Sequence, residues 1–169
     1  MFIRPTRRGW RFDGHTAAVA DGGPWTVRYT VAVDRHWRTR TAHVWTWTAA
    51  GNRHDMLVAD GAGRWDVNGE HAPHLDGCLD VDLESSACTN TLPVHRLASV
   101  ATGVHEAPAA YVSVLDPAVE RLDQTYELYG DGDRGPLYDY TALRFEFACR
   151  LEYDRSGLVV NYPGIATRR

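Results

Sequence analysis

Apolar and polar residues alternate with a period of two along several stretches of this chain, which is the pattern of half-buried β-strands. The clearest stretch is 25–33, where tryptophan, valine and tyrosine alternate with smaller or polar residues. A turn signal at 21–24 (DGGP) precedes it, and Asp-Arg at 34–35 leads into a second alternating stretch at 36–48. We therefore expect two neighbouring strands joined by a tight turn.

The second stretch carries an unusual number of aromatic residues on alternate positions. Strict alternation predicts one face made of Trp37, Thr39, Thr41, His43, Trp45 and Trp47. It predicts the opposite face from Arg38, Arg40 and Val44. His43 among the tryptophans is then expected in the core or in the wall of a pocket.

The rest of the chain predicts more short strands separated by turns. We expect strands at 10–12, 56–59, 64–67, from 70 onward, 78–83, 109–115, 124–128, 143–153 and 158–162. Asn68-Gly69 is a strong hairpin signal. Residues 98–108 are expected to be irregular, 116–122 could form one helical turn, and 130–136 reads as a loop tip.

No helical periodicity extends beyond about two turns. The pattern therefore predicts a mainly β fold: a curled antiparallel sheet forming an incomplete or closed β-barrel with little helix. At 169 residues, the length fits a single domain over 1–169.

The stretch 74–97 carries the most informative polar pattern. In its strand, Leu79, Val81 and Leu83 share one face, and Cys78, Asp80 and Asp82 share the other. Acidic residues are poor strand formers, so two on one face need an explanation. A structural ion pair with Arg40 or Arg96 is favoured, because a half-buried carboxylate must be paired or neutralised. A solvated face, or a general acid and base as in glycosidases, are the alternatives.

The composition of the chain limits the classes of partner that the protein is expected to bind. The formal charge is −4 and the isoelectric point about 6.0, which argues against nucleic acid or an anionic membrane as the main partner. The three cysteines are an odd number, which suits a reducing compartment. The first residues lack the apolar segment of a secretory signal, and no apolar run reaches membrane-spanning length. We expect a cytoplasmic protein without a membrane span.

Motifs for cofactors and catalysis are not found. The chain contains no nucleophile elbow, P-loop, zinc-protease or dinucleotide fingerprint. His71, His74 and Cys78 do not follow a zinc spacing, and Cys88 is read as a small buried hydrophobe. We predict no catalytic residue, no metal and no cofactor.

Six tryptophans and eight tyrosines exceed what a small β core needs. Such side chains serve either as plain packing or as a concave apolar wall with polar handles. The aromatic residues on strands or at strand ends are Trp37, Trp45, Trp47, Trp65, Tyr111, Tyr126 and Tyr162.

The chain resembles a bacterial family called putative glycolipid-binding, formerly a domain of unknown function. The matching segments are 34–40 (DRHWRTR), 60–65 (DGAGRW), 77–83 (GCLDVDL), 89–93 (TNTLP), 96–97, 124–126 (QTY) and 162–164 (YPG), with Arg168 near the end. The resemblance implies an incomplete β-barrel similar in shape to bacterial lipoprotein carriers and mycobacterial lipid-binding lipoproteins. Function inferred from that shape is an analogy.

Together, residues and resemblance favour a non-enzymatic binder that holds a lipid or glycolipid on the concave side of a β half-barrel. An arginine would grip an anionic head group, Asn and Asp would hold hydroxyls, and aromatic rings would take the apolar part. The expected ligand-binding residues are Trp37, Arg40, Trp65, Asp80, Asp82, Thr89, Asn90, Arg96, Gln124, Tyr126, Tyr162 and Arg168.

Three questions stay open from sequence. One alternative is an enzyme that acts on a small sugar- or lipid-like substrate through Asp80 and Asp82. Another is a structural or interaction module without a ligand. Pairing of two chains through open sheet edges is undecided.

Overall fold

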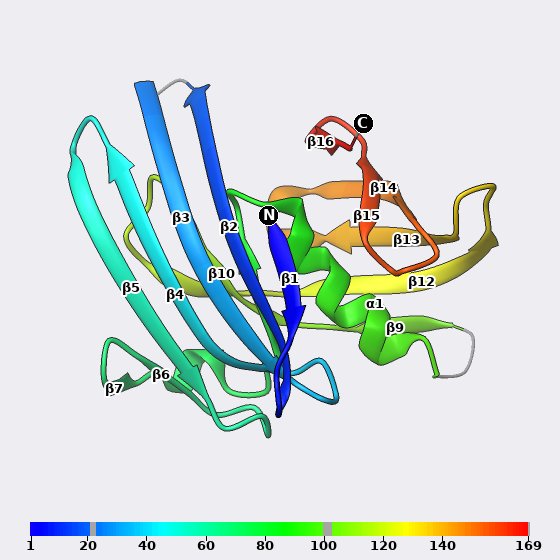
Figure 1. Ribbon diagram of the computed structural model, residues 1–169, viewed down its shortest axis with the longest axis horizontal. Helices are drawn as coiled ribbons and strands as arrows, with labels where there is room; N and C mark the ends of the chain where they lie inside the picture. The colour runs from blue at the N-terminus through cyan, green and yellow to red at the C-terminus, as the bar shows by residue number, and fades with distance from the viewer. Residues whose placement is uncertain (21–22, 100–102, 169) are drawn as a thin grey trace.

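The computed structural model describes residues 1–20, 23–99 and 103–168, which form three β-sheets and a few short helices (Figure 1). The seven-stranded sheet runs in chain order through β1 (Phe2–Pro5), β2 (Gly9–Ala20), β3 (Gly23–Asp34), β4 (Thr39–Thr48), β5 (Gly51–Ala59), β6 (Trp65–Val67) and β7 (Glu70–His71). The three-stranded sheet has the order β11 (Val119–Leu122), β10 (Ala109–Val112), β8 (Asp80–Leu83). The six-stranded sheet has the order β16 (Ala166–Thr167), β15 (Val159–Tyr162), β14 (Phe147–Tyr153), β13 (Pro136–Ala142), β12 (Gln124–Asp131), β9 (Val104–Glu106).

The helical segments are η1 (Pro73–Leu75), η2 (Ala87–Asn90), α1 (Thr91–Leu97) and η3 (Leu143–Phe145). The predicted mainly β class is confirmed, and the sheets do not close into a barrel over the described residues. Neighbouring strands are antiparallel, except that β8 and β10 pair in parallel. No helix among the described residues is long and apolar enough to cross a membrane.

The three-stranded sheet lies between the two larger sheets, and its strand β8 is buried on both faces. Val81 and Leu83 join the core that the seven-stranded sheet forms. Leu122 joins a second core with the tyrosines of the six-stranded sheet. All four residues of β8 are buried, which explains why its acidic face cannot be a solvated one.

The alternation at 25–33 is confirmed, because Val27, Tyr29, Val31 and Val33 are all buried. In the next strand, Thr41, His43, Trp45 and Trp47 share one face as predicted, but Thr39 is buried and Trp37 lies in the turn before the strand. The turn before β4 places Trp37 at a left-handed φ of 60°, and the pairing of β3 with β4 shifts at Ala32/Val33.

Beyond that shift, the buried positions of β4 are Ala42, Val44 and Thr46. His43 and Trp45 therefore stack on the opposite face, and Trp47 is 43% exposed.

Three further expectations are corrected. Residues 116–122 contain strand β11 and no helical turn, and the 98–108 stretch contains strand β9. The strand expected over 143–153 begins only at Phe147. Leu143–Phe145 form η3, and Glu146 takes a left-handed φ of 48°, which breaks the alternation.

Leu92 is helical although it precedes Pro93, and a residue before proline usually favours an extended conformation. Pro93 is tolerated because it lies in the first turn of α1, where no intrahelical N–H is needed.

Because Gly14 has no side chain, the Tyr29 ring has room to lie over strand β2. Gly14 lies opposite Tyr29, and a Cβ at Gly14 would come within 2.1 Å of the Tyr29 Cζ atom. The ring cannot retreat easily, because it is buried and its hydroxyl lies 2.9 Å from Ser86 Oγ and 3.0 Å from Cys88 Sγ.

We therefore expect Gly14→Ala to lower the free energy of unfolding by about 1–3 kcal/mol through overpacking. Urea denaturation measures the change. Ala18→Val is the control, because Ala18 lies on the same strand but is exposed. Equal stability of wild type and Gly14→Ala would contradict this packing.

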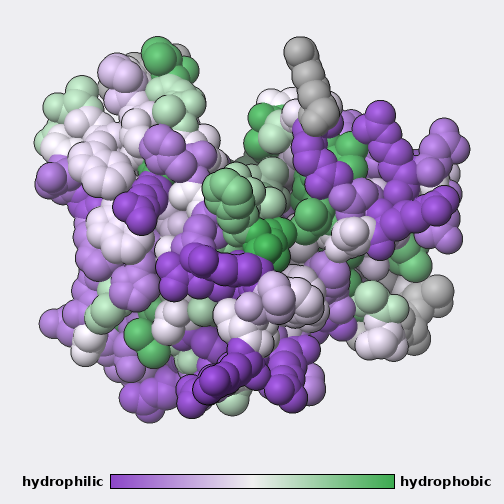
Figure 2. All heavy atoms as spheres, in the orientation of Figure 1, coloured by the Kyte–Doolittle hydropathy of each residue, from purple (hydrophilic) through white to green (hydrophobic). Residues whose placement is uncertain are grey.

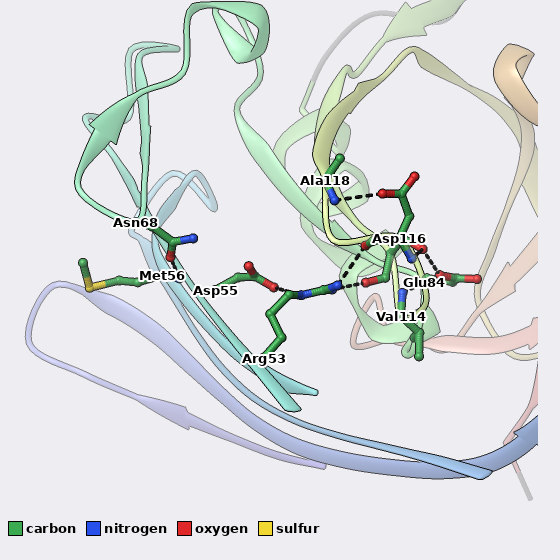
Figure 3. Close-up of polar contacts among 9 residues, drawn as sticks. Arg53, Asp55, Met56, Asn68, Glu84, Val114, Asp116 and Ala118 are labelled. Atoms are coloured by element: carbon green, nitrogen blue, oxygen red, sulfur yellow. Dashed lines mark hydrogen bonds and ion pairs between the residues drawn. The ribbon is translucent and has the colours of Figure 1, made fainter. Parts of the chain in front are cut away.

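Arg53 ties the edge of the seven-stranded sheet to the loop after β10 (Figure 3). Its guanidinium donates to buried Asp55 and to the carbonyl oxygens of Ser113 and Asp116. Glu84, just after β8, accepts from the Ser113 hydroxyl and the Val114 N–H. These contacts fix the end of β8 relative to the large sheet.

Candidate functional site

A cavity of about 270 Å³ lies between the end of β8 and the strands β13–β15. Its apolar and aromatic lining consists of Leu83, Ala87, Tyr111, Leu122, Tyr140, Ala142, Phe145, Phe147, Tyr162 and Ile165. Asp82, Glu84 and Asn90 are the polar lining residues. An apolar cleft with a few convergent polar groups is the usual form of a small-molecule site.

The mouth of this cavity carries exposed apolar side chains, since Phe145 is 48% and Ile165 58% exposed. The face of the molecule drawn in Figure 2 is mostly hydrophilic, and hydrophobic residues gather near its middle, beside the notch between the two larger sheets.

Asp82 is the acidic group that faces the cavity. Its side chain is buried, and its Oδ1 atom accepts a 2.7 Å hydrogen bond from the Thr89 hydroxyl. Burial raises the pKa of Asp82 to about 6; the nearby Asp80 adds to this rise, and the Thr89 hydrogen bond opposes it. The same Thr89 oxygen accepts the Leu83 N–H, so η2 is anchored to β8 at this point.

Asp80 has a different environment, although it shares a face of β8 with Asp82. It is 1% exposed, and both of its carboxylate oxygens accept from the Arg96 guanidinium, at 2.5 and 2.7 Å. Burial raises the pKa of Asp80, and Arg96 opposes that rise. The expected ion pair therefore exists with Arg96. The guanidinium of Arg96 is therefore bonded to Asp80, and Arg96 does not line the cavity.

A network of phenols and amides supports the cavity wall from behind. Asn90 donates from Nδ2 to the Tyr126 hydroxyl at 2.9 Å, and the Tyr153 hydroxyl donates to the Asn90 carbonyl at 3.1 Å. The Tyr140 hydroxyl donates to Gln124 Oε1 at 2.9 Å. Burial raises the pKa of Tyr126, Tyr140 and Tyr153, so these phenols stay neutral donors at ordinary pH.

The structure thus brings together most of the residues from β8, η2, α1 and β12 that sequence singled out. Asp82, Asn90 and Tyr162 line the cavity, and the side chains behind them belong to Asp80, Thr89, Arg96, Gln124 and Tyr126. Their role in binding stays a prediction.

Four predicted residues lie elsewhere. Trp37 stacks on His95 at 3.6 Å between ring centroids, and also on Trp10. Trp65 is fully buried and donates from Nε1 to the Cys78 carbonyl. Arg40 lies 3.8 Å from Asp34, and Arg168 pairs with Asp154.

Sequence reasoning missed several lining residues. Tyr140 and Ala142 lie on β13, for which no strand was predicted, and Glu84 and Ile165 had no distinguishing pattern. Phe145 and Phe147 lie in the stretch 143–153, for which a strand was expected, and the alternation of that stretch was the signal that could have marked them.

The histidines near β8 do not converge on a metal site. His74 Nε2 lies 2.9 Å from the Val119 carbonyl, and His71 lies 3.5 Å from Asp76. Within 1–20, 23–99 and 103–168, no group of three or more His, Cys, Asp or Glu side chains is arranged to hold a metal ion.

The sequence model of one protein family, described as putative glycolipid-binding, matches residues 1–168. The chain belongs to this family. Its fold is similar to the crystal structure of a DUF1089 family protein from Pseudomonas aeruginosa, with 29% sequence identity and a TM-score of 0.83. The match covers 99% of this chain and 90% of that protein. No curated protein matches the chain.

Several of the segments on which the resemblance to this family was based build loops. Asp60 Oδ1 accepts the N–H groups of Ala62 and Arg64, and Gly61 and Gly63 take positive φ values there. Asp34 accepts from the backbone of the following turn in the same way. These positions stabilise turns and lie outside the cavity, which accounts for motif residues without a binding role there.

Proposed function

We propose that this protein binds an amphipathic, lipid-like small molecule in the cavity between β8 and β13–β15. The main observation that supports this proposal is a pocket with an aromatic wall, in which Asp82 and Asn90 lie among apolar side chains. The membership in a family described as glycolipid-binding supports a ligand whose head group carries hydroxyls or other hydrogen-bond donors.

The volume supports a ligand of modest size, because drug-sized ligands fill pockets of about 300–1,000 Å³. A head group with a short chain fits, and the remainder of a longer chain would leave through the mouth beside Phe145 and Ile165.

The enzyme alternative needs two carboxylates that reach one substrate. Of Asp80 and Asp82, only Asp82 lines the cavity, whereas Asp80 is held behind it by Arg96. The geometry therefore favours binding over acid–base chemistry by this pair. Cytoplasmic localisation and pairing with a second copy stay proposals from the sequence.

Octyl glucoside below its micelle concentration tests the proposal. At about 100 times Kd, a ligand that binds only the folded state adds about 2.7 kcal/mol, or a rise in Tm of about 5–10 °C. Ala142→Leu fills the cavity and is expected to abolish this rise. Ala148→Leu is the matched control, because Ala148 is exposed on the neighbouring strand β14. A rise that Ala142→Leu leaves intact would place binding elsewhere and contradict the proposal.

A further inference from the structure

Asp82 differs from the other buried acidic residues in having no cation beside it. Among the described residues, the buried carboxylates are Asp55, Asp80 and Asp82. Asp55 lies 2.6 Å from Arg53, and Asp80 lies 2.5 Å from Arg96. Asp82 has the Thr89 hydroxyl and no ion pair within this part of the chain. A buried carboxylate without a counter-charge is costly to the fold, so its retention needs a reason.

The cavity has an excess of negative charge. Its lining includes the carboxylates of Asp82 and Glu84 and no arginine or histidine. Arg144, next to the lining residue Phe145, is paired with Glu120. An anionic head group entering here would meet a buried like charge, whereas a cationic group would find a partner.

The aromatic wall favours the same kind of ligand. Rings of Tyr111, Tyr140, Phe147 and Tyr162 line the space that Asp82 faces. The face of an aromatic ring is negative, so an ammonium group near it gains attraction in addition to its pairing with a carboxylate.

We infer that the cavity selects an amphipathic amine, with an ammonium group paired to Asp82 and an alkyl chain against the aromatic wall. This inference rests on the proposed function and names the head group of its ligand. It differs from the sequence-based expectation of an arginine that holds an anionic head, because Arg96 is occupied by Asp80.

Four ligands with the same octyl chain test the inference: octylamine, octanol, octyl glucoside and octyl phosphate. Isothermal titration calorimetry at about pH 7.5 is expected to show octylamine binding about tenfold more tightly than octanol, and octyl phosphate more weakly than octanol. Asp82→Asn is expected to remove the advantage of octylamine and to leave octanol binding within about twofold.

Glu127→Gln is the control for net charge, because Glu127 is exposed on β12 and does not line the cavity. We expect it to change octylamine affinity by less than about threefold, because exposed charges are screened. A similar loss in both variants would show a general charge effect and overturn the pairing with Asp82.

A pH series gives an independent readout. The ionisable groups whose electrostatics couple to Asp82 are Asp80, Cys88, Tyr111, Tyr126, Tyr140, Tyr153 and Tyr162. Burial raises the pKa of the Cys88 thiol and of these phenols, and it raises the pKa of Asp80 as well as that of Asp82, so the comparison with Asp82→Asn decides which carboxylate governs the binding. Between about pH 7.5 and about pH 5, octylamine affinity is expected to fall in wild type and to stay constant in Asp82→Asn, since an alkylamine stays protonated throughout.

The outcomes separate this inference from the proposed function. Equal binding of octylamine, octanol and octyl glucoside would overturn the amine preference and leave the cavity as a lipid-like site. Binding of none of the four probes would overturn both. A preference for octylamine that survives in Asp82→Asn would overturn the assignment to Asp82.

Discussion

Replacing Arg96 with leucine is expected to lower the free energy of unfolding by about 3–5 kcal/mol at neutral pH. The reason is that Asp80 is 1% exposed and both of its oxygens are bonded to Arg96, so the variant leaves a buried carboxylate without a partner. Urea denaturation followed by tryptophan fluorescence measures the change. The variant is expected to be less destabilised at low pH, where Asp80 is protonated.

Two further variants serve as comparisons for Arg96→Leu. Arg150→Leu removes the ion pair with Asp139, in which both side chains are exposed, and is expected to destabilise the protein far less than Arg96→Leu does. The double variant Arg96→Leu/Asp80→Leu removes both charges and is expected to recover part of the loss. Equal effects of Arg96→Leu and Arg150→Leu would show that the buried pair does not brace β8 against α1.

Asp82→Asn is expected to stabilise the protein at pH above about 7. The folded state raises the pKa of Asp82 from 3.8 to about 6, so between these values it binds more protons than the unfolded state. Stability contributed by this group is therefore full below about pH 4 and is lost as pH rises through about 6. A difference of about two pH units corresponds to about 3 kcal/mol, which is the upper limit of the gain.

Denaturation of wild type and Asp82→Asn across about pH 4.5 to 8 measures this effect. The two curves are expected to diverge as pH increases, with the variant more stable at the alkaline end. Thr89→Val is a useful comparison, because it removes the hydroxyl that donates to Asp82 and is expected to destabilise at all pH values. A variant Asp82→Asn less stable than wild type at pH 8 would contradict an unpaired, buried carboxylate.

According to these two predictions, Asp80 and Asp82 have different roles although they share one face of β8. Asp80 is neutralised by Arg96 and holds α1 on β8, which is a structural role. Asp82 is left unneutralised beside a cavity, at a cost to stability that ligand binding would offset. Such a trade-off between stability and a binding site is common in natural proteins.

The sequence predicted the fold class because strands such as β3 are buried on one face and keep strict alternation. It failed where a local backbone feature interrupts the period. Trp37 and Glu146 take left-handed conformations without being glycines, and each is followed by a strand whose start was misassigned. Non-glycine residues with positive φ have no reliable sequence signal.

The site was predictable in part for a similar reason. Two acidic residues on one strand face signalled unusual chemistry, and Asp82 does face the cavity. The sequence could not tell that Arg96, rather than Arg40, pairs with Asp80, because that depends on how α1 packs on β8. The alternation of Tyr138, Tyr140 and Ala142 with Asp139 and Thr141 was the signal that could have marked β13. The position of Tyr140 in the cavity wall depends on the pairing of β13 with β12 and β14.

A crystal structure grown with octylamine tests the central claim most directly. The account predicts electron density for the ligand in the cavity between β8 and β13–β15, with its nitrogen within hydrogen-bond distance of Asp82 and its chain against Tyr140 and Tyr162. The same cavity occupied by the protein's own side chains, or ligand bound only at another surface, would contradict it.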